Sequence, residues 1–308
     1  WDGLYGLYEA DDAQYDVKTT YQGGKGKVSS CPGIDKAIKD GGDLIAKLDA
    51  ADFSGADLRG DWANGLPCAW PVTEDMRAVD HFPLAVDEAC YQGDGVAVVV
   101  AESRALAKDA AELVEVDYEP LPAAVGVAAS LADGATLAHE SLGTNECYVW
   151  KLATEGVDDV FAGADVVVSR SYYQPRLIPN AMEPRSVLAQ AGPGDGVTMW
   201  STTQIPHILR FAVGVVLGIN ESHVRIVAPD VGGGFGSKVD VYAEEMLALA
   251  LTRRLDRPVK WTEERSEGYT STIHGRDFVT TYELAATKDG TILGCRADIK
   301  AAMGAYLQ

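Results

Sequence analysis

The sequence predicts a mixed α/β (α+β) fold, because strand-type and helix-type patterns alternate along its 308 residues. A valine-rich run at 96–100 has the composition of a strand buried on both faces. Residues 206–216 repeat apolar side chains at helical spacing. Near the C-terminus, strand-like stretches at 278–284 and 292–300 flank an Asp-Gly pair, which is typical of a β-hairpin turn.

The first half of the chain predicts one strand–helix–strand unit, whose simplest role is packing. After the strand at 96–100 comes Ser103, a residue type that commonly caps helix N-termini. A returning strand is expected at 114–118, before a Pro-Leu-Pro segment ends it. The apolar face of the helix between them consists of Leu106, Ala107, Ala110, Ala111 and Val114.

The second half predicts a further block of strands and helices. Pro206 suits the first turn of a helix, since its missing N–H is not needed there, and Gly218 can end that helix. Its inward stripe is expected to be Ile208, Leu209, Ala212, Val213 and Val216, and that of a helix at 240–253 Tyr242, Met246, Leu249 and Ala250. Strands are expected at 165–173 (with Val166, Val168 and Tyr172 on one face), 196–203 and 224–228.

Two stretches are less informative. Residues 1–53 lack a clear period, although 34–51 could form a helix broken at a glycine pair. Residues 123–158 are rich in alanine and glycine and are expected to be a connector.

The net charge of −20 disfavours nucleic-acid and anionic-lipid partners and favours high solubility. The longest apolar run, 211–219, is too short to span a bilayer, so no transmembrane segment is expected. The chain begins with neither an initiator methionine nor a signal peptide and ends without a stop signal of its own. We therefore expect a fragment of a longer chain.

The five cysteines are widely scattered and form no CxxC pair. This pattern disfavours a disulfide framework, a structural zinc site and an iron–sulfur cluster within the chain. Scattered, reduced thiols fit a cytoplasmic protein.

The segment with the clearest chemical signal is 231–238, which reads Val-Gly-Gly-Gly-Phe-Gly-Ser-Lys between a predicted strand and a predicted helix. Glycines there let main-chain N–H groups approach an anion or oxo group, and the following helix adds positive potential. The order of residues does not fit a GxxxxGK[ST] phosphate loop, and Ser237 replaces the third glycine of a dinucleotide fingerprint. A flexible turn remains the simpler alternative.

The same segment, together with the upstream Ser-Thr-Thr-Gln at 201–204, resembles the molybdenum-cofactor loop of the xanthine oxidase family, which includes aldehyde oxidases and aerobic carbon monoxide dehydrogenases. The interval between Gln204 and Gly234 matches the family's spacing between its glutamine and its Phe-Gly loop. Residues 180–185 resemble a further family motif, and residues 91–102, followed by 114–122, resemble the preceding hammerhead-like domain.

The resemblance implies a hammerhead-like α/β domain at 54–125, followed by the first molybdenum-cofactor-binding domain at 126–308, which is expected to be incomplete. Residues 1–53 stay unassigned.

The resemblance also implies roles for individual residues. Gln204 would hydrogen-bond an oxygen ligand of molybdenum, and Phe235 would border the metal and substrate channel, which makes both candidate catalytic residues. The cofactor-binding set would be Gln204, Gly233, Gly234, Phe235 and Gly236, with no direct metal ligand. A neutral amide suits this task because it donates to an oxo group without changing the charge at the metal.

Val239 departs from the purine-oxidising members, which place a glutamate after the lysine. Its side chain can neither donate, accept nor carry charge, so carbon monoxide, an aldehyde or an N-heterocycle is expected rather than xanthine. Three weaker candidates receive structural interpretations: His274 as a solvated or hydrogen-bonded structural histidine, the pair Met182-Glu183 as an organiser of the core, and Glu263, Glu264 and Glu267 as a solvated charge run.

By resemblance, the complete enzyme oxidises its substrate with water as the oxygen source, using molybdenum–molybdopterin, expected in the cytosine dinucleotide form. Electrons would pass to an Fe–S small subunit and an FAD medium subunit in a dimer of heterotrimers. The family's base glutamate and later active-site loop have no match in this chain, so the fragment alone is expected to be inactive. A non-redox α/β module that binds an anionic ligand at the loop is the alternative, and a catalytically silent assembly subunit is a third option.

Overall fold

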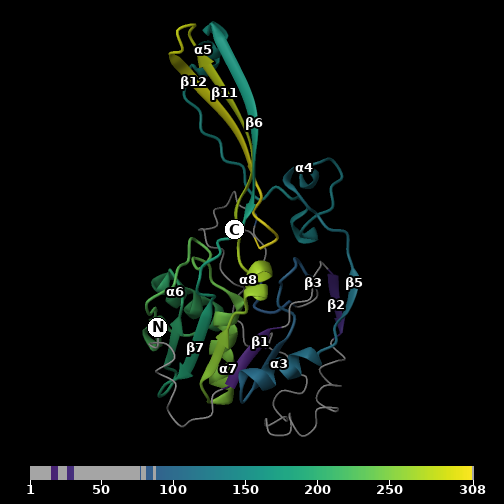
Figure 1. Cartoon of the computed structure of the whole chain (residues 1–308), viewed down its shortest axis with the longest axis vertical. Coiled ribbons are helices and arrows are strands. Elements are labelled where there is room, and N and C mark those ends of the chain that lie inside the picture. Colours follow the sequence, from purple (N-terminus) through teal and green to yellow (C-terminus); the bar gives the residue numbers. More distant parts are fainter. Residues whose placement is uncertain (1–14, 20–25, 31–76, 78–80, 86–87, 307–308) are drawn as a thin grey trace. The chain divides into compact units, whose positions relative to one another are not determined.

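The computed structural model describes residues 15–19, 26–30, 77, 81–85 and 88–306 (Figure 1). Helices and strands alternate along the chain, which confirms the expected mixed α/β fold. The chain forms two compact units. The first unit comprises Trp1–Trp70, Asp80–Pro122 and Pro179–Ile273, and the second comprises Pro71–Val79, Ala123–Ile178 and His274–Gln308. The helix expected at 34–51 lies outside the described residues.

The first unit contains a six-stranded mixed sheet with the order β4-β1-β10-β7-β8-β9. Strand β1 runs parallel to β10 and β8 runs parallel to β9, while the other neighbours are antiparallel. The strands are β1 (Tyr15–Thr19), β4 (Val98–Ala101), β7 (Ser186–Ala191), β8 (Val197–Ser201), β9 (Val224–Val227) and β10 (Val259–Thr262). Strands β1, β7 and β10 were not expected from the sequence.

The expected strand–helix–strand unit is correct in order and wrong in pairing. Helix α3 (Arg104–Glu112) follows β4, and Ser103 caps it by accepting a hydrogen bond from Leu106 N at 3.3 Å. However, β5 (Asp117–Pro120) does not return to the sheet of β4. It pairs with β2 (Gly26–Ser30), which also pairs with β3 (Glu88–Ala89), in a separate three-stranded antiparallel sheet. Strands β4 and β5 therefore lie in different sheets, and each pairs with a strand from the start of the chain, β4 with β1 and β5 with β2.

Helix α6 (Pro206–Leu217) begins at the expected proline and ends at Gly218, which adopts the left-handed conformation with a φ of 64°. Ile208 is the exception to its expected stripe, because it is 54% exposed. The short 3₁₀ helix η4 (Glu221–His223) leads into β9, and helix α7 (Ala243–Leu255) starts slightly later than expected.

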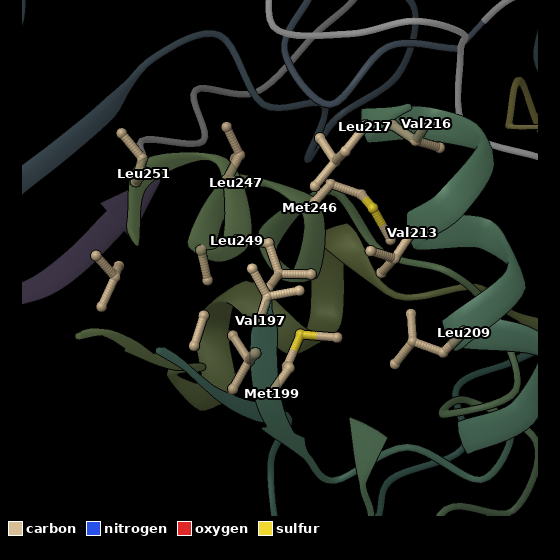
Figure 2. Packing of buried hydrophobic residues seen from close by; sticks show 14 of the residues in the cluster. Val197, Met199, Leu209, Val213, Val216, Leu217, Met246, Leu247, Leu249 and Leu251 are labelled. Atoms are coloured by element: carbon tan, nitrogen blue, oxygen red, sulfur yellow. The ribbon is translucent and has the colours of Figure 1, made fainter. Parts of the chain in front are cut away.

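The core of the first unit lies where α6 and α7 pack on the sheet (Figure 2). Met199 of β8, Leu209 and Val213 of α6, and Met246 and Leu249 of α7 are fully buried. Burying one such side chain contributes about 1.5–3 kcal/mol. This packing holds the ends of β8 and β9 and the start of α7, which are the three points that frame the glycine-rich loop.

The second unit is built on three long antiparallel strands in the order β12-β11-β6. They are β6 (Val166–Leu177), β11 (Gly275–Ala286) and β12 (Ile292–Ala301). Strands β11 and β12 confirm the expected hairpin. The expected connector at 123–158 also contains regular structure, namely α4 (Val127–Ser130), η3 (Glu140–Leu142) and the start of α5 (Val157–Gly163).

The two faces of this sheet differ in chemistry. One carries the expected Val166, Val168 and Tyr172 of β6, all at least 40% exposed, which pair with Ala286, Leu284 and Thr280 of β11. Helix α5 packs on the other face, where the guanidinium carbon of Arg296 lies 4.0 Å from the centre of the Phe161 ring. In the described part of the chain, no helix is long and apolar enough to cross a membrane.

Candidate functional site

The glycine-rich loop at 231–238 lies between β9 and α7, as the sequence predicts. Gly233, Phe235 and Gly236 all have positive φ angles, of 94°, 54° and 96°. For Phe235 this left-handed conformation costs of the order of 1 kcal/mol, because its Cβ crowds the backbone. The Ser237 N–H and hydroxyl both donate to Gly234 O at 3.0 Å, which closes the turn. The Phe235 ring is left 77% exposed.

Gln204 lies directly against this loop. Its side-chain Oε1 accepts hydrogen bonds from the main-chain N–H groups of Gly236 at 3.1 Å and Lys238 at 3.3 Å. Its own main-chain N–H donates to Lys238 O at 2.8 Å. The two segments that the resemblance relates, although distant in sequence, are therefore in direct contact.

These contacts also fix the orientation of the Gln204 amide. Two N–H donors face one end of the amide, so that end must be the oxygen. The Nε2 donor then points away from the loop, where it makes no hydrogen bond to any residue that the structure describes, and the side chain is exposed. The residue thus presents a neutral donor on a rigid support.

Gly234 is required for this contact. A Cβ at this position would lie 2.2 Å from Oε1 and 2.5 Å from Cδ of Gln204. The Gln204 amide therefore occupies the space that any other side chain at position 234 would need.

Glu183 holds the two ends of the loop. Its Oε2 accepts hydrogen bonds from Gly232 N at 2.6 Å and from the Lys238 ammonium at 3.0 Å. Burial lowers the pKa of Lys238, and the hydrogen bond to Glu183 partly offsets this. The expectation that Met182-Glu183 organises the core is wrong for Met182, which is 88% exposed.

A buried ionic cluster around Arg185 lies next to the loop and was not found from the sequence. The Arg185 guanidinium is bonded to Glu263 at 2.8 Å and to Glu244 at 3.1 Å, and stacks 3.8 Å from the centre of the Tyr242 ring. The Tyr242 hydroxyl donates to Ser237 O, which connects the cluster to the loop.

The interpretation of Glu263, Glu264 and Glu267 as a solvated charge run is wrong, since Glu263 is 5% and Glu267 7% exposed. Glu264 is the N-cap of helix α8 (Arg265–Ser271), and Glu267 accepts its N–H at 2.6 Å. The Glu-x-x-Glu spacing is a capping-box pattern, and the start of this helix could have been predicted from it.

Glu245 joins the start of α7 to the end of β8. It accepts hydrogen bonds from the Ser201 hydroxyl at 2.6 Å and from Tyr242 N at 3.1 Å. Burial raises the pKa of Glu245 to about 7, and burial likewise raises the pKa of the nearby Asp240 to about 6. Since β8 leads directly into Gln204, this contact helps to place the amide.

The remaining candidates occupy different positions. Val239 follows the loop at 37% exposure, and a Cβ at Gly236 would lie 4.0 Å from its Cγ2. In the second unit, His274 bonds to Ala302 O at 3.1 Å through Nε2 and to the Tyr306 hydroxyl through Nδ1, which confirms it as a hydrogen-bonded structural histidine. Among the described residues, no group of three or more His, Cys, Asp or Glu side chains could hold a metal ion.

The residues fit a group that carries oxygen acceptors. Besides Gln204 Nε2, the main-chain N–H groups of Gly233, Gly234 and Phe235 make no hydrogen bond to a described residue. The exposed Phe235 ring lies beside these donors. Such a set of neutral donors can bind an oxo or anionic group without adding a charge.

Comparison with known families places this site in context. Residues 138–308 match the molybdopterin cofactor-binding domain, and residues 53–122 match the a/b hammerhead domain of aldehyde oxidase and xanthine dehydrogenase. Both predicted parts of the fold, a hammerhead-like domain and a molybdenum-cofactor-binding domain after it, are thereby confirmed.

Two curated relatives illustrate the similarity. The chain is 38% identical to the carbon monoxide dehydrogenase large chain of Afipia carboxidovorans over 277 residues, which cover 85% of this chain and 33% of the relative. It is 36% identical to the nicotine 6-hydroxylase large subunit of Paenarthrobacter nicotinovorans over 236 residues, covering 76% of this chain and 29% of the relative. The chain thus spans about a third of the length of these relatives.

Among solved structures, quinoline 2-oxidoreductase from Pseudomonas putida 86 is similar, with a TM-score of 0.81 and 27% identity over 97% of this chain and 38% of that one. Sequence families, curated relatives and structure agree. The chain belongs to the family of molybdenum-binding large subunits typified by xanthine dehydrogenase, aldehyde oxidase and carbon monoxide dehydrogenase.

Proposed function

We propose that the chain is part of a molybdenum hydroxylase large subunit that oxidises carbon monoxide, an aldehyde or an N-heterocycle with water as the oxygen source. The observation that supports this most directly is the Gln204 amide, whose oxygen is held by Gly236 N and Lys238 N while its donor points outward. A donor fixed in this way suits an oxygen ligand of molybdenum.

In the proposed mechanism, the bound molybdenum cofactor supplies the two-electron oxidation, and this chain positions the reacting groups. Gln204 would donate to an oxygen of the bound cofactor. The N–H groups of Gly233, Gly234 and Phe235 supply further donors, and Gly236 helps to hold the amide of Gln204 in place. The Phe235 ring narrows the approach of the substrate and excludes water from one side.

The substrate class is inferred from Val239. This side chain offers only hydrocarbon beside the loop, so a substrate that needs a charged or hydrogen-bonding partner there, such as a purine, is disfavoured. A small or weakly polar substrate loses no hydrogen bond at this position. This is why we favour carbon monoxide, an aldehyde or an N-heterocycle other than a purine.

We further propose partner subunits that carry Fe–S clusters and FAD, a dimer of heterotrimers, a cytosine dinucleotide form of molybdopterin and a cytoplasmic location. Electrons removed from the substrate would pass to these partner subunits. The scattered cysteines support a reducing compartment.

The direct test is metal and pterin analysis of the full-length native protein, purified with its partners. We expect stoichiometric molybdenum together with a pterin dinucleotide. Protein that contains neither, but binds phosphate-type ligands at the glycine-rich loop, would instead support a non-redox anion-binding module.

A second prediction concerns Gly234→Ala in the assembled enzyme. The new Cβ would displace the Gln204 amide, so turnover is expected to fall roughly 10–100-fold, as for other losses of a residue that orients a metal site. Steady-state kinetics and molybdenum content measure this. Gly163→Ala is the matched control, because a Cβ at Gly163 would meet no atom within 4 Å. Equal activity of both variants would contradict the assignment.

A further inference from the structure

We propose that Glu183 is a positioning residue, whose carboxylate joins the two ends of the glycine-rich loop and thereby holds the Gln204 amide with its donor outward. The catalytic consequence rests on the proposed function. The effect on the loop follows from the contacts alone.

The first step is the geometry of the Glu183 carboxylate. A single oxygen, Oε2, is 2.6 Å from Gly232 N and 3.0 Å from the Lys238 ammonium nitrogen. The Glu183 main-chain N–H also donates to Gly232 O at 3.2 Å. Gly232 precedes the three residues with positive φ, and Lys238 follows them. One side chain therefore ties the loop where it begins and where it ends.

The second step connects Lys238 to Gln204. The main-chain N–H of Lys238 donates to Gln204 Oε1 at 3.3 Å, and its carbonyl accepts the Gln204 N–H at 2.8 Å. Any movement of Lys238 therefore moves both the main chain and the side chain of Gln204. The Glu183 carboxylate acts on the amide through this residue and does not contact it.

The third step is the charge of Lys238, which is only 3% exposed. Its ammonium forms an ion pair with Glu183, which is 18% exposed, and Arg185 lies close enough to oppose the positive charge. Without Glu183, the buried ammonium would lose its hydrogen-bonded anion and would still face Arg185, with Glu263, which is not hydrogen-bonded to it, as a partly compensating charge. Removing one partner of a buried pair is much more costly than removing both.

The test uses the full-length subunit in its assembled enzyme and three variants: Glu183→Gln, Lys238→Met and the double variant. The glutamine keeps an acceptor for Gly232 N but removes the anion. Hydrogen exchange measured by mass spectrometry is expected to be roughly tenfold faster for peptides covering 232–238 in each single variant, the size expected for losing one charge-assisted hydrogen bond. Molybdenum content and turnover should fall in the same single variants.

In the double variant no unpaired charge remains, so exchange at 232–238 should return to within a few-fold of the wild-type rate. Glu221→Gln is the matched control, because Glu221 forms an exposed pair with Arg210 and should leave the loop unchanged. Unchanged exchange in Glu183→Gln, or effects of the two substitutions that simply add, would overturn the positioning role. Absence of molybdenum from the wild-type enzyme would instead overturn the proposed function, whatever the exchange results.

Discussion

Replacing Gln204 with glutamate is expected to lower turnover of the assembled enzyme by about 100-fold, while the glycine-rich loop keeps its shape. The glutamate oxygen can still accept the N–H groups of Gly236 and Lys238, so the contact that holds the loop remains. The outward Nε2 donor is replaced by a second carboxylate oxygen, which repels an oxygen ligand instead of binding it. Steady-state kinetics and hydrogen exchange of the loop measure the two effects separately.

Two further variants complete this experiment. Gln204→Ala removes both the donor and the loop contact, so it should lose activity and also loosen residues 232–238. Gln190→Ala removes an exposed glutamine from the neighbouring strand β7 and should change neither. Near-normal turnover of Gln204→Glu would show that the donor is not used in the reaction.

Replacing Arg185 with methionine is expected to destabilise the first unit by about 3–5 kcal/mol, because it leaves the carboxylates of Glu244 and Glu263 buried and unpaired with this cation. The substitution keeps most of the volume between Tyr242 and the neighbouring residues, so the loss is mainly electrostatic. Chemical denaturation of the full-length subunit measures the free energy of unfolding.

A matched control and a rescue define the cause. Arg210→Met breaks an ion pair whose side chains are 47% and 44% exposed, and should cost less than about 1 kcal/mol. Adding Glu244→Gln and Glu263→Gln to Arg185→Met should recover part of the stability, since no unpaired charge is then buried. If the triple variant is less stable than Arg185→Met, the loss arises from packing.

Local features of the fold could be predicted because their signals are local. Pro206 and Gly218 mark both ends of α6, Ser103 caps α3, and the Asp-Gly turn joins β11 to β12. The six-stranded sheet could not be predicted in the same way. In this sheet β1 pairs with β10, which lies far from it in the sequence. Nothing in the residue pattern of either segment indicates that the two strands pair.

The candidate site shows the same division. The glycines and Gln204 could be recognised because their spacing is distinctive, but Glu183 and Arg185 could not. Arg185 meets Glu263, which lies far along the sequence. Charged residues are usually solvated, so the acidic run at 263–267 by itself indicates a surface position. Only the fold shows that Glu263, together with Glu244, pairs with the buried Arg185 cation.

The two faces of the β6-β11-β12 sheet carry different side chains, and this difference favours one alignment of its strands. Side chains alternate between faces, so sliding β6 by a single residue along β11 would bring Val168 towards the side of α5 and send Ser169 outward. Every hydroxyl and hydrocarbon of that strand would change sides at once. The hydrogen bond between Ser171 and Thr281, 2.8 Å long, would also be lost. A misaligned β6 therefore differs from the native strand most clearly around Ser169, Arg170 and Ser171, because the neighbouring valines and tyrosines would be replaced by residues of the same kind.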